Sequence, residues 1–436
     1  MHMTIRSALT QAGSRYWLRD ARIIRGGALA QVDLRIEDGR IAAVAPPGTA
    51  TEGVSMDGGQ VWPGLVDAHT HLDKGHIWPR MPNQTGDFAG AIAAVMADRG
   101  AAWTAEDIFA RADFALRSAY AHGTVAIRSH LDSYLPLART TWPVFEKLRA
   151  AWHGRIALQI CSIAPLDRFQ GPEGDELADL VHRHGGTLGM VTRLTGGIHA
   201  DLPPEFQPML DHFFELAETR GLDLDLHVDE SGETGARALR EIALTALRRE
   251  FKGRIQCGHC CSLSLQPDDF AQDTIRALAE AGIDIVVLPM CNMYLQDRVA
   301  GRTPRWRGVT LVHEMRAAGL RVSLASDNTR DPFYAYGDLD MVEVYREAVR
   351  ILHLDHPMGA WPDAVSAIPA EAMGLKGVGR IEAGASADLI LFSARGMTEL
   401  LSRPQSDRIV LRAGRVLEAT PPDYRELDAV LGVSPA

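Results

Sequence analysis

The sequence predicts an α/β protein, a (β/α)8 TIM-like barrel accompanied by a small β-sandwich domain that both chain ends form together. Eight short apolar, β-branched runs recur along the middle of the chain, and amphipathic stretches typical of helices lie between them. The spacing is nearly regular, since His227, His259 and Cys291 follow one another at intervals of 32 residues. One strand, one helix and two loops occupy about that much chain, and eight such units are the signature of a closed parallel barrel.

The eight runs are almost continuously apolar, which is typical of parallel strands that are covered on both faces. They span residues 61–71, 124–132, 155–167, 187–197, 222–230, 254–262, 283–292 and 321–328. Between them lie stretches such as AEDIFARADFALRSAYAHG and PMLDHFFELAETRG, several of which end in glycine, as helices often do. An open doubly wound sheet is the competing architecture, but no G-x-G-x-x-G motif follows any run.

The two chain ends have a different pattern. YWLRDARIIRGG and VDLRIEDGRIAAVAPP read as short alternating strands with a D-G turn, which predicts a hairpin. ADLILFSARG and DRIVLRAGRVLEA, near the other end, are also typical of strands. We therefore expect residues 1–60 and 376–436 to form one composite β-sandwich domain, with residues 61–375 as the barrel.

Bulk composition excludes several classes of function. The chain has 436 residues and a formal net charge of -11, so it lacks the basic surface that would bind nucleic acid or an anionic membrane. No apolar stretch reaches the ~18–20 residues of a membrane span, and we find no export signal. We expect a cytoplasmic protein with a small-molecule substrate and no nucleic-acid or membrane partner. The sequence leaves the oligomeric state open, a homo-oligomer included.

The five cysteines do not form a recognisable framework. CGHCC resembles a metal knuckle, but no second cysteine pair lies at zinc-finger spacing. We interpret all five as small buried residues, which suits a reducing compartment.

Metal-competent side chains gather at the predicted strand ends. His69 and His71 are two residues apart in the first run and therefore point to the same side of a strand. His227 lies in the fifth run, His259 in the sixth and Asp327 in the eighth. Each has an ordinary structural explanation when taken alone, a packed core histidine or a helix-capping acid. Their coincidence at strand ends of one barrel favours a mixed nitrogen and oxygen site for Zn²⁺ or Fe²⁺.

The motifs resemble those of the amidohydrolase superfamily over nearly the whole chain. PGLVDAHTHLDK resembles its strand-one metal motif, and GVGRIEAGASADLILFS resembles its return into the β domain. Within the superfamily, HTHLDK, RSHLD, HVDE, MCNMYLQDR and RDPFYAYGDLDM are most similar to the bacterial cytosine deaminase branch.

This resemblance implies a hydrolase with one divalent metal ion, Zn or Fe, held by His69, His71, His227 and Asp327. Neither the third nor the fourth run contains a lysine that could bridge two metals. The catalytic residues implied are Glu230, His259 and Asp327: His259 and Asp327 take the proton of the nucleophilic water, and a protonated Glu230 shuttles protons to the ring and the departing amine.

The implied reaction is deamination of cytosine or an analogue such as isocytosine or 5-methylcytosine, within pyrimidine metabolism. The alternatives are hydrolysis of a creatinine-like ring or an N-substituted aminotriazine, or a catalytically silent scaffold. Three substrate positions depart from the cytosine deaminase pattern: Leu166 replaces a glutamine, Asn328 an aspartate and Phe333 a tryptophan. If the alignment shifts by one residue, Asp167 takes the recognition role of Leu166.

The loop after the first run, HLDKGHIWPRMPN, has two interpretations. It is either a lid that closes over the site, carrying residues from Lys74 to Arg80, or a fixed segment in which Asp73 and Lys74 form a structural ion pair.

Overall fold

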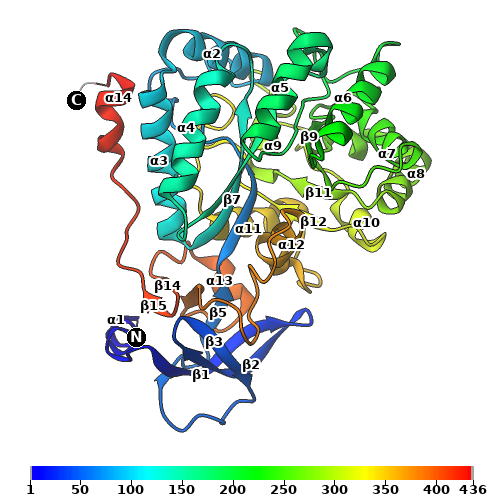
Figure 1. Ribbon diagram of the computed structural model, residues 1–436. Coiled ribbons are helices and arrows are strands. Elements are labelled where there is room, and N and C mark those ends of the chain that lie inside the picture. Colours follow the sequence, from blue (N-terminus) through cyan, green and yellow to red (C-terminus); the bar gives the residue numbers. More distant parts are fainter. Residues whose placement is uncertain (1, 434–436) are drawn as a thin grey trace. The chain divides into compact units, whose positions relative to one another are not determined.

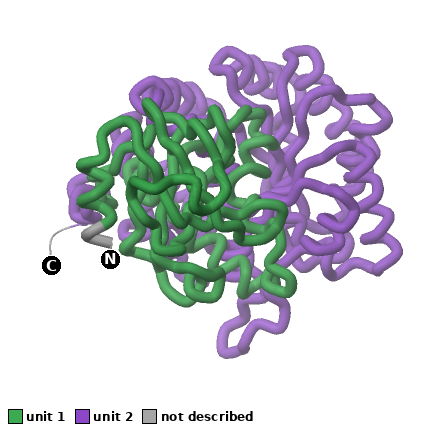
Figure 2. Tube along the Cα trace, turned by 90° about the horizontal axis from the view of Figure 1, so that it is seen from below, with its two compact units in different colours: residues 1–67, 117–126, 339–422 green, residues 68–116, 127–338, 423–436 purple. Residues whose placement is uncertain are grey.

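The computed structural model describes residues 2–433, and the chain divides into two compact units. Unit 1 holds the chain up to Asp67, residues 117–126 and residues 339–422. Unit 2 holds residues 68–116, residues 127–338 and the chain from Asp423 onward. Figure 2 colours the two units separately.

One eight-stranded sheet dominates unit 1, in the order β15-β14-β13-β5-β1-β2-β3, with β4 paired to β1. Its strands are β1 (Arg15–Arg25), β2 (Ala28–Glu37), β3 (Arg40–Ala45), β4 (Val54–Ser55), β5 (Gln60–Pro63), β13 (Leu389–Phe392), β14 (Ile409–Arg412) and β15 (Arg415–Val416). β2 and β3 pair antiparallel around Asp38 and Gly39, which confirms the predicted hairpin. Strands from both chain ends share this sheet, because β5 pairs antiparallel with β13.

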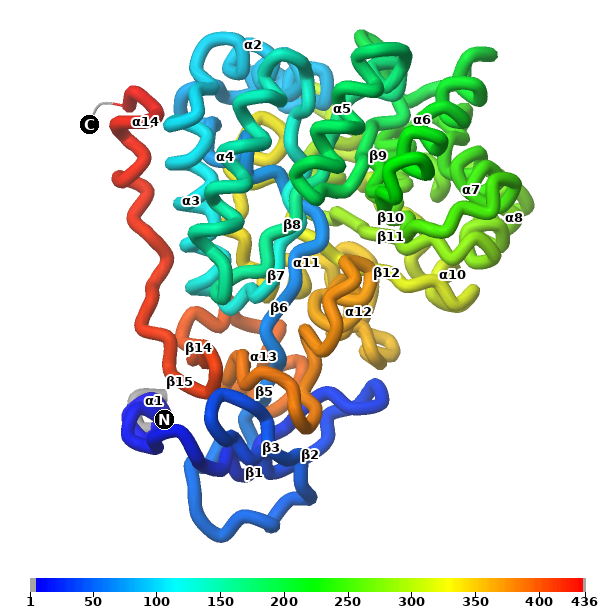
Figure 3. Tube along the Cα trace, viewed as in Figure 1, coloured from blue at the N-terminus to red at the C-terminus, as the bar shows by residue number. Residues whose placement is uncertain are grey.

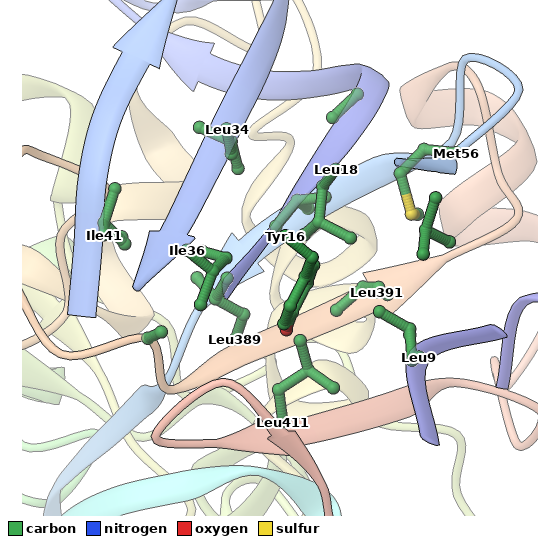
Figure 4. Packing of buried hydrophobic residues seen from close by; sticks show 14 of the residues in the cluster. Leu9, Tyr16, Leu18, Leu34, Ile36, Ile41, Met56, Leu389, Leu391 and Leu411 are labelled. Atoms are coloured by element: carbon green, nitrogen blue, oxygen red, sulfur yellow. The ribbon is translucent and has the colours of Figure 1, made fainter. Parts of the chain in front are cut away.

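Alternating side chains of this sheet form the core of unit 1. Leu18, Leu34 and Ile36 have no exposed surface, and Leu389 and Leu391 come from the C-terminal part of the chain (Figure 4). Burying one such side chain contributes about 1.5–3 kcal/mol to stability. The shared core therefore joins the two chain ends. A second facing sheet, which a sandwich requires, stays a prediction.

Among the described residues, the helices that lie wholly in unit 1 are one of 12 residues and three of ten residues or fewer. They are α1 (His2–Gln11), α11 (Met341–Leu352), α12 (Ala367–Ala372) and α13 (Met397–Ser402), with the 3-10 turn η3 (Trp361–Val365). Asp340 caps α11 by accepting a hydrogen bond from the backbone N–H of Val342 at 3.0 Å.

Strands and helices alternate through unit 2, which is an α/β arrangement (Figure 1). The strands are β6 (Leu65–Thr70) and β7 (Thr124–Asp132), which both begin in unit 1, then β8 (Ala157–Ile163), β9 (Leu224–Val228), β10 (Ile255–His259), β11 (Asp284–Val287) and β12 (Val322–Leu324). They form a three-stranded sheet, β6-β7-β8, and a four-stranded sheet, β12-β11-β10-β9, whose pairs are parallel.

These strands do not form one continuous closed barrel. Single parallel bridges connect the two sheets instead. Thr70 of β6 bridges to Asp327, and on the other side residues 187–188 bridge both to Cys161 of β8 and to Leu224 of β9. The fourth predicted strand, residues 187–197, contains only such isolated bridges, so its prediction as a regular strand is wrong. At Gly189 the hydroxyl of Ser162 takes the place of backbone hydrogen bonds to a neighbouring strand. It accepts from the Gly189 N–H and donates to the Gly189 carbonyl, both at 2.9 Å.

Helices follow most strands of unit 2. They are α2 (Phe88–Ala102), α3 (Ala105–His122), which continues into unit 1, α4 (Ala138–Ala151), α5 (Gly171–Arg183), α6 (Phe206–Arg220), α7 (Ala238–Arg248), α8 (Asp268–Glu280), α9 (Pro289–Leu295), α10 (Val312–Ala317) and α14 (Asp428–Leu431). The 3-10 turns are η1 (Leu166–Phe169), η2 (Cys261–Leu265) and η4 (Tyr424–Leu427). Helices α5 to α8 lie outside strands β9 to β12 (Figure 3). The helix-like stretches in the sequence correspond to α3, α5, α6 and α8.

All five cysteines are buried and free, as predicted. Within residues 2–433, no helix combines the length and the apolarity that crossing a membrane requires.

Candidate active site

The ends of three strands carry the predicted metal ligands in unit 2. His69 lies in β6, His71 follows that strand directly, and His227 lies in β9. Asp327 comes three residues after β12, and its backbone N–H donates to the His69 carbonyl at 2.9 Å. All four side chains are at most 4% exposed.

The ligand atoms of these residues converge. The Nε2 atom of His227 lies 3.0 Å from that of His69 and 3.3 Å from that of His71. Oδ1 of Asp327 lies 3.2 Å from Nε2 of His71 and 3.7 Å from Nε2 of His69. Four ligands around one tetrahedral ion at about 2.1 Å would be roughly 3.4 Å apart. The spacing therefore fits a single divalent cation.

Burial keeps the imidazoles of this cluster neutral. It lowers the pKa of four histidines well below the usual value, and the neighbouring imidazoles lower it further: His69, His71, His227 and His259. Neutral imidazoles have the free lone pairs that metal ligands need. The electrostatics therefore favour the protonation state that cation binding requires.

Two site residues have strained backbones. Asp327 has φ +63° and His259 has φ +68°, which is the left-handed region. Such a conformation costs about 1–3 kcal/mol and persists only where the surroundings hold it. At Asp327 the hydroxyl of Thr70 does so by donating to the Asp327 carbonyl at 2.7 Å. The strain places its carboxylate against the histidine cluster.

Glu230 lies beside His259 at the edge of the cluster. Its Oε1 is 3.4 Å from Nδ1 of His259, and the side-chain amide of Asn292 donates to it at 3.3 Å. Burial raises the pKa of Glu230 well above the usual glutamate value, the negative charge of Asp327 raises it further, and Arg193 opposes the shift. Glu230 is therefore a buried carboxylic acid whose raised pKa favours the protonated form.

Sequence reasoning missed a polar layer that contacts the cluster. The ring of His130 lies 4.0 Å from that of His69, and its Nε2 is 3.2 Å from Oδ1 of Asp225. Arg128 and Gln256 donate to Asp225 at 2.7 and 2.8 Å. The signal was in RSHLD, because Arg128 and His130 are two residues apart in a strand and point to the same side.

A partly open cavity lies over the cluster. Its wall combines the histidine and acid groups with apolar side chains, several of them from α2: His71, His227, Glu230, His259, Asp327, Phe88, Ile92, Val95, Met96, Ile163 and Val191. Helix α2 was not predicted to take part. Lys74, Asp132, Arg193 and Tyr134 supply further polar groups.

Two of the four predicted substrate contacts line this cavity, Asn328 and Phe333. The amide of Asn328 donates to Oδ2 of Asp331 at 2.7 Å, which fixes its orientation. The ring of Phe333 lies edge-on to that of Phe88, with centroids 5.7 Å apart. These two rings give the cavity an aromatic wall.

The structure does not bring the other two predicted contacts, Leu166 and Asp167, into the cavity wall. Both lie in η1, where Leu166 is fully buried and the carboxylate of Asp167 accepts from the backbone N–H of Thr195 at 2.8 Å. From the same region of the chain, Ile163 and Val191 line the cavity instead. A role for Leu166 or Asp167 in substrate binding stays a prediction.

The loop after β6 is anchored by ion pairs. Lys74 pairs with Asp132 at 2.6 Å and not with Asp73, which instead accepts from the backbone N–H of Asp132 at 2.7 Å. Arg80 pairs with Asp98 of α2 and with Asp107 of α3, and both acids are buried. Closure of this loop as a lid stays a prediction.

Comparison with known proteins defines the family. The family model described as amidohydrolase family matches residues 194–417. A pterin deaminase from Rhizobium rhizogenes strain K84 is 52% identical over 409 residues, which cover 93% of this chain and 92% of that protein. The chain belongs to the amidohydrolase family.

Solved structures of amidohydrolases agree with the fold. The 5-methylcytosine deaminase of Klebsiella pneumoniae with 5-fluorocytosine has a TM-score of 0.82 and 22% identity, over 94% of this chain and 98% of that one. The N-isopropylammelide isopropylaminohydrolase of Burkholderia multivorans has a TM-score of 0.73 and 26% identity, over 92% and 98%. The fold is accordingly TIM-barrel-like α/β. The resemblance to the amidohydrolase superfamily is confirmed.

Proposed function

We propose that this protein is a metal-dependent deaminase that releases ammonia from the amino-substituted carbon of a pterin. The observation that carries the proposal is the position of Glu230, a buried proton-holding acid beside a cluster of three imidazoles and a carboxylate. The relative that is 52% identical is a pterin deaminase. Two lines of support, one chemical and one by similarity, favour the same reaction.

The substrate proposal refines the expectation from the sequence. Isocytosine is one of the cytosine analogues that the sequence resemblance implies as substrates, and the pyrimidine ring of a pterin carries the same arrangement of amino and oxo groups. The second ring needs additional apolar space, which the α2 side chains Phe88, Ile92 and Val95 provide opposite Phe333. Cytosine itself uses little of this wall, so specificity for cytosine has no support here.

The chain's own residues would hold one divalent ion, Zn²⁺ or Fe²⁺. His69, His71, His227 and Asp327 provide three neutral nitrogens and one carboxylate at spacings that fit such an ion. A divalent ion bound there would lower the pKa of a water molecule toward neutrality and so make a nucleophile available at physiological pH.

Proton transfer is assigned to Asp327 and Glu230. Asp327 accepts one proton from the attacking water, while Glu230 gives its proton to the ring nitrogen next to the attacked carbon. Glu230 then takes the remaining proton of the added oxygen, and the amine leaves as ammonia with the proton that Asp327 held. The net change is exchange of an amino group for an oxo group.

His259 acts by orienting the oxygen in this scheme. The amide nitrogen of Asn292 lies 2.9 Å from Nδ1 of His259. We assign this amide as the donor, which places the ring proton on Nε2. This Nε2 has no hydrogen-bond partner among the described residues. It donates to the attacking oxygen, which refines the role of proton acceptor expected from the sequence.

We also propose that unit 2 represents an interrupted form of the eight-unit barrel expected for residues 61–375, and that the strands of the two segments expected to form the β-sandwich, residues 1–60 and 376–436, build that domain within unit 1. Residues 339–375 also lie in unit 1, and the described chain from Asp423 lies in unit 2. The single bridges that join the two sheets support the first part, and the pairing of β5 with β13 supports the second.

An ammonia-release screen tests the function. Purified protein is incubated with pterin, isocytosine, cytosine, 5-methylcytosine and creatinine, and the products are examined by mass spectrometry for exchange of NH2 for OH. We expect pterin to have the highest kcat/KM. Absence of turnover with pterin, in protein that contains metal, would refute the proposal.

A further inference from the structure

A second cavity lies beside the catalytic cavity in unit 2. Residues 192–203 form most of its wall. Arg193 lines both cavities. Val191, two residues earlier, lines the catalytic cavity and bridges to His227, so this segment begins directly at a proposed metal ligand.

Two polar groups in the wall between these cavities are unsatisfied. Arg193 forms no hydrogen bond or ion pair with any residue that the structure describes, and its Nε is buried. His199 is 3% exposed; its Nδ1 lies 3.0 Å from the hydroxyl of Thr192, whereas its Nε2 has no partner within residues 2–433. Arg193 is half-buried, so part of its guanidinium faces solvent, whereas the unpaired Nε2 of His199 is buried. Buried polar groups are normally paired, so this ring nitrogen beside an unpaired cation indicates a place for a ligand.

The acids of the same wall do not satisfy Arg193. Asp229 uses both carboxylate oxygens to accept from the backbone N–H groups of Ala238 and Leu239, at 3.2 and 2.9 Å. The carboxylate of Asp201 packs against Gly235, where an added Cβ would lie 1.7 Å from its Oδ1. The positive charge of Arg193 is therefore available to a ligand.

The part of the catalytic cavity lined by Phe88 and Phe333 is adjacent to the second cavity. Phe88 lines the catalytic cavity, and its ring centroid lies 5.7 Å from that of Phe333 and 6.4 Å from that of His199. Only the side chain of Phe88 would therefore separate a flat ring bound against Phe333 from His199. A substituent on the far side of that ring has a short path to Arg193.

We propose that the second cavity is a subsite for an acidic substituent of the substrate, a carboxylate carried by the second ring of the pterin. Arg193 pairs with the carboxylate, and Nε2–H of His199 donates a hydrogen bond to it. Guanidinium groups suit this role because they form short, charge-assisted and often bidentate bonds to carboxylates. The inference rests on the proposed function, because it assigns a substituent to the same substrate.

A specificity ratio tests the subsite. kcat/KM is measured for pterin-6-carboxylate and for unsubstituted pterin, and the ratio of the two values is compared between variants. In Arg193→Gln we expect this ratio to fall at least tenfold, with Arg193→Lys recovering part of it. Arg193 also acts on the charge of Glu230, which changes turnover of both substrates, and the ratio removes that common effect.

Two further variants complete the test. His199→Phe keeps a ring and removes both nitrogens, and we expect a severalfold fall in the same ratio. Arg183→Gln is the matched control, because Arg183 is an exposed arginine on α5 and its loss removes the same charge from the chain. Circular dichroism confirms that each variant is folded.

The outcomes separate the two proposals. Turnover of pterin with a ratio that Arg193→Gln leaves within twofold of wild type overturns the subsite and leaves the deaminase assignment intact. A ratio that falls equally in Arg183→Gln also overturns the subsite. Absence of turnover with both substrates refutes the proposed function, and the subsite with it.

Discussion

Oε1 of Glu230 lies 3.4 Å from Nδ1 of His259, and both groups are buried. The amide nitrogen of Asn292 is within hydrogen-bonding distance of the two, at 3.3 and 2.9 Å. Asn292 therefore connects Glu230 to His259, which lies beside the histidine cluster. In the proposed mechanism, this one amide couples proton transfer by Glu230 to orientation of the nucleophile by His259.

Glu230→Gln is expected to abolish most turnover. Glutamine keeps the shape and the hydrogen bond from Asn292 but cannot transfer a proton, and such a group contributes about 10²–10⁴-fold to rate. We expect kcat to fall within that range while metal content stays at the wild-type level. Glu233→Gln, at an exposed position three residues further on, is the matched control. Near-normal turnover in Glu230→Gln would remove this residue from the mechanism.

The cluster is expected to bind one equivalent of metal. Elemental analysis of the purified protein should give close to one Zn or Fe per chain, and His71→Ala should lose most of it. Because a ligand bound only to the folded state stabilises that state, chelation should also lower the melting temperature of the wild type. His182→Ala, an exposed histidine on α5, is the control. Two equivalents per chain would contradict the single-ion assignment.

Asp225→Ala is expected to destabilise the chain strongly. Arg128, which is 3% exposed, would keep a buried charge with no carboxylate partner, and removing one partner of a buried pair costs about 3–5 kcal/mol. Urea unfolding should show a loss of that size. Asp175→Ala breaks an exposed pair with Arg220 and should cost about 1 kcal/mol or less. Equal losses in the two variants would contradict the structural role of the buried layer.

Much of the catalytic constellation was predictable because strand ends in an α/β barrel converge on one point. His69, His71, His227 and Asp327 were identified by their places after apolar runs, and the structure brings all four together. His259 and Glu230 followed from the same reasoning. The strand pattern located these residues because each lies in a regular strand or follows one within three residues.

The rest depended on contacts that a linear pattern does not contain. Helix α2 contributes a wall of the cavity, yet its sequence resembles that of any apolar helix. Residues 187–197 look like a strand, but the hydroxyl of Ser162 takes the backbone bonds of Gly189. Leu166 was predicted to contact the substrate because it aligns with a glutamine of the cytosine deaminase pattern, whereas in the structure it is buried in the 3-10 turn η1.

Phe88→Leu is expected to reduce selectivity for a bicyclic substrate. Loss of an aromatic contact of this kind costs about 0.5–1.5 kcal/mol, so kcat/KM for pterin should fall about two- to tenfold relative to that for isocytosine. A single ring would contact less of α2 and should be less affected. Phe109→Leu, on the partly exposed face of α3, is the control. An equal change for both substrates would argue against a bicyclic ligand beside α2.

The pH dependence of turnover should report the ionisation of Glu230. Its protonated form is the proton donor, so kcat/KM is retained below the pKa of Glu230 and is lost as pH rises through it. Burial raises this pKa and the positive charge of Arg193 lowers it, so Arg193→Gln should move the basic limb of the profile for unsubstituted pterin to higher pH. Arg183→Gln should leave the limb in place. A shift to lower pH in Arg193→Gln would show that another group controls the basic limb, because removal of a nearby positive charge can only raise the pKa of a carboxyl group.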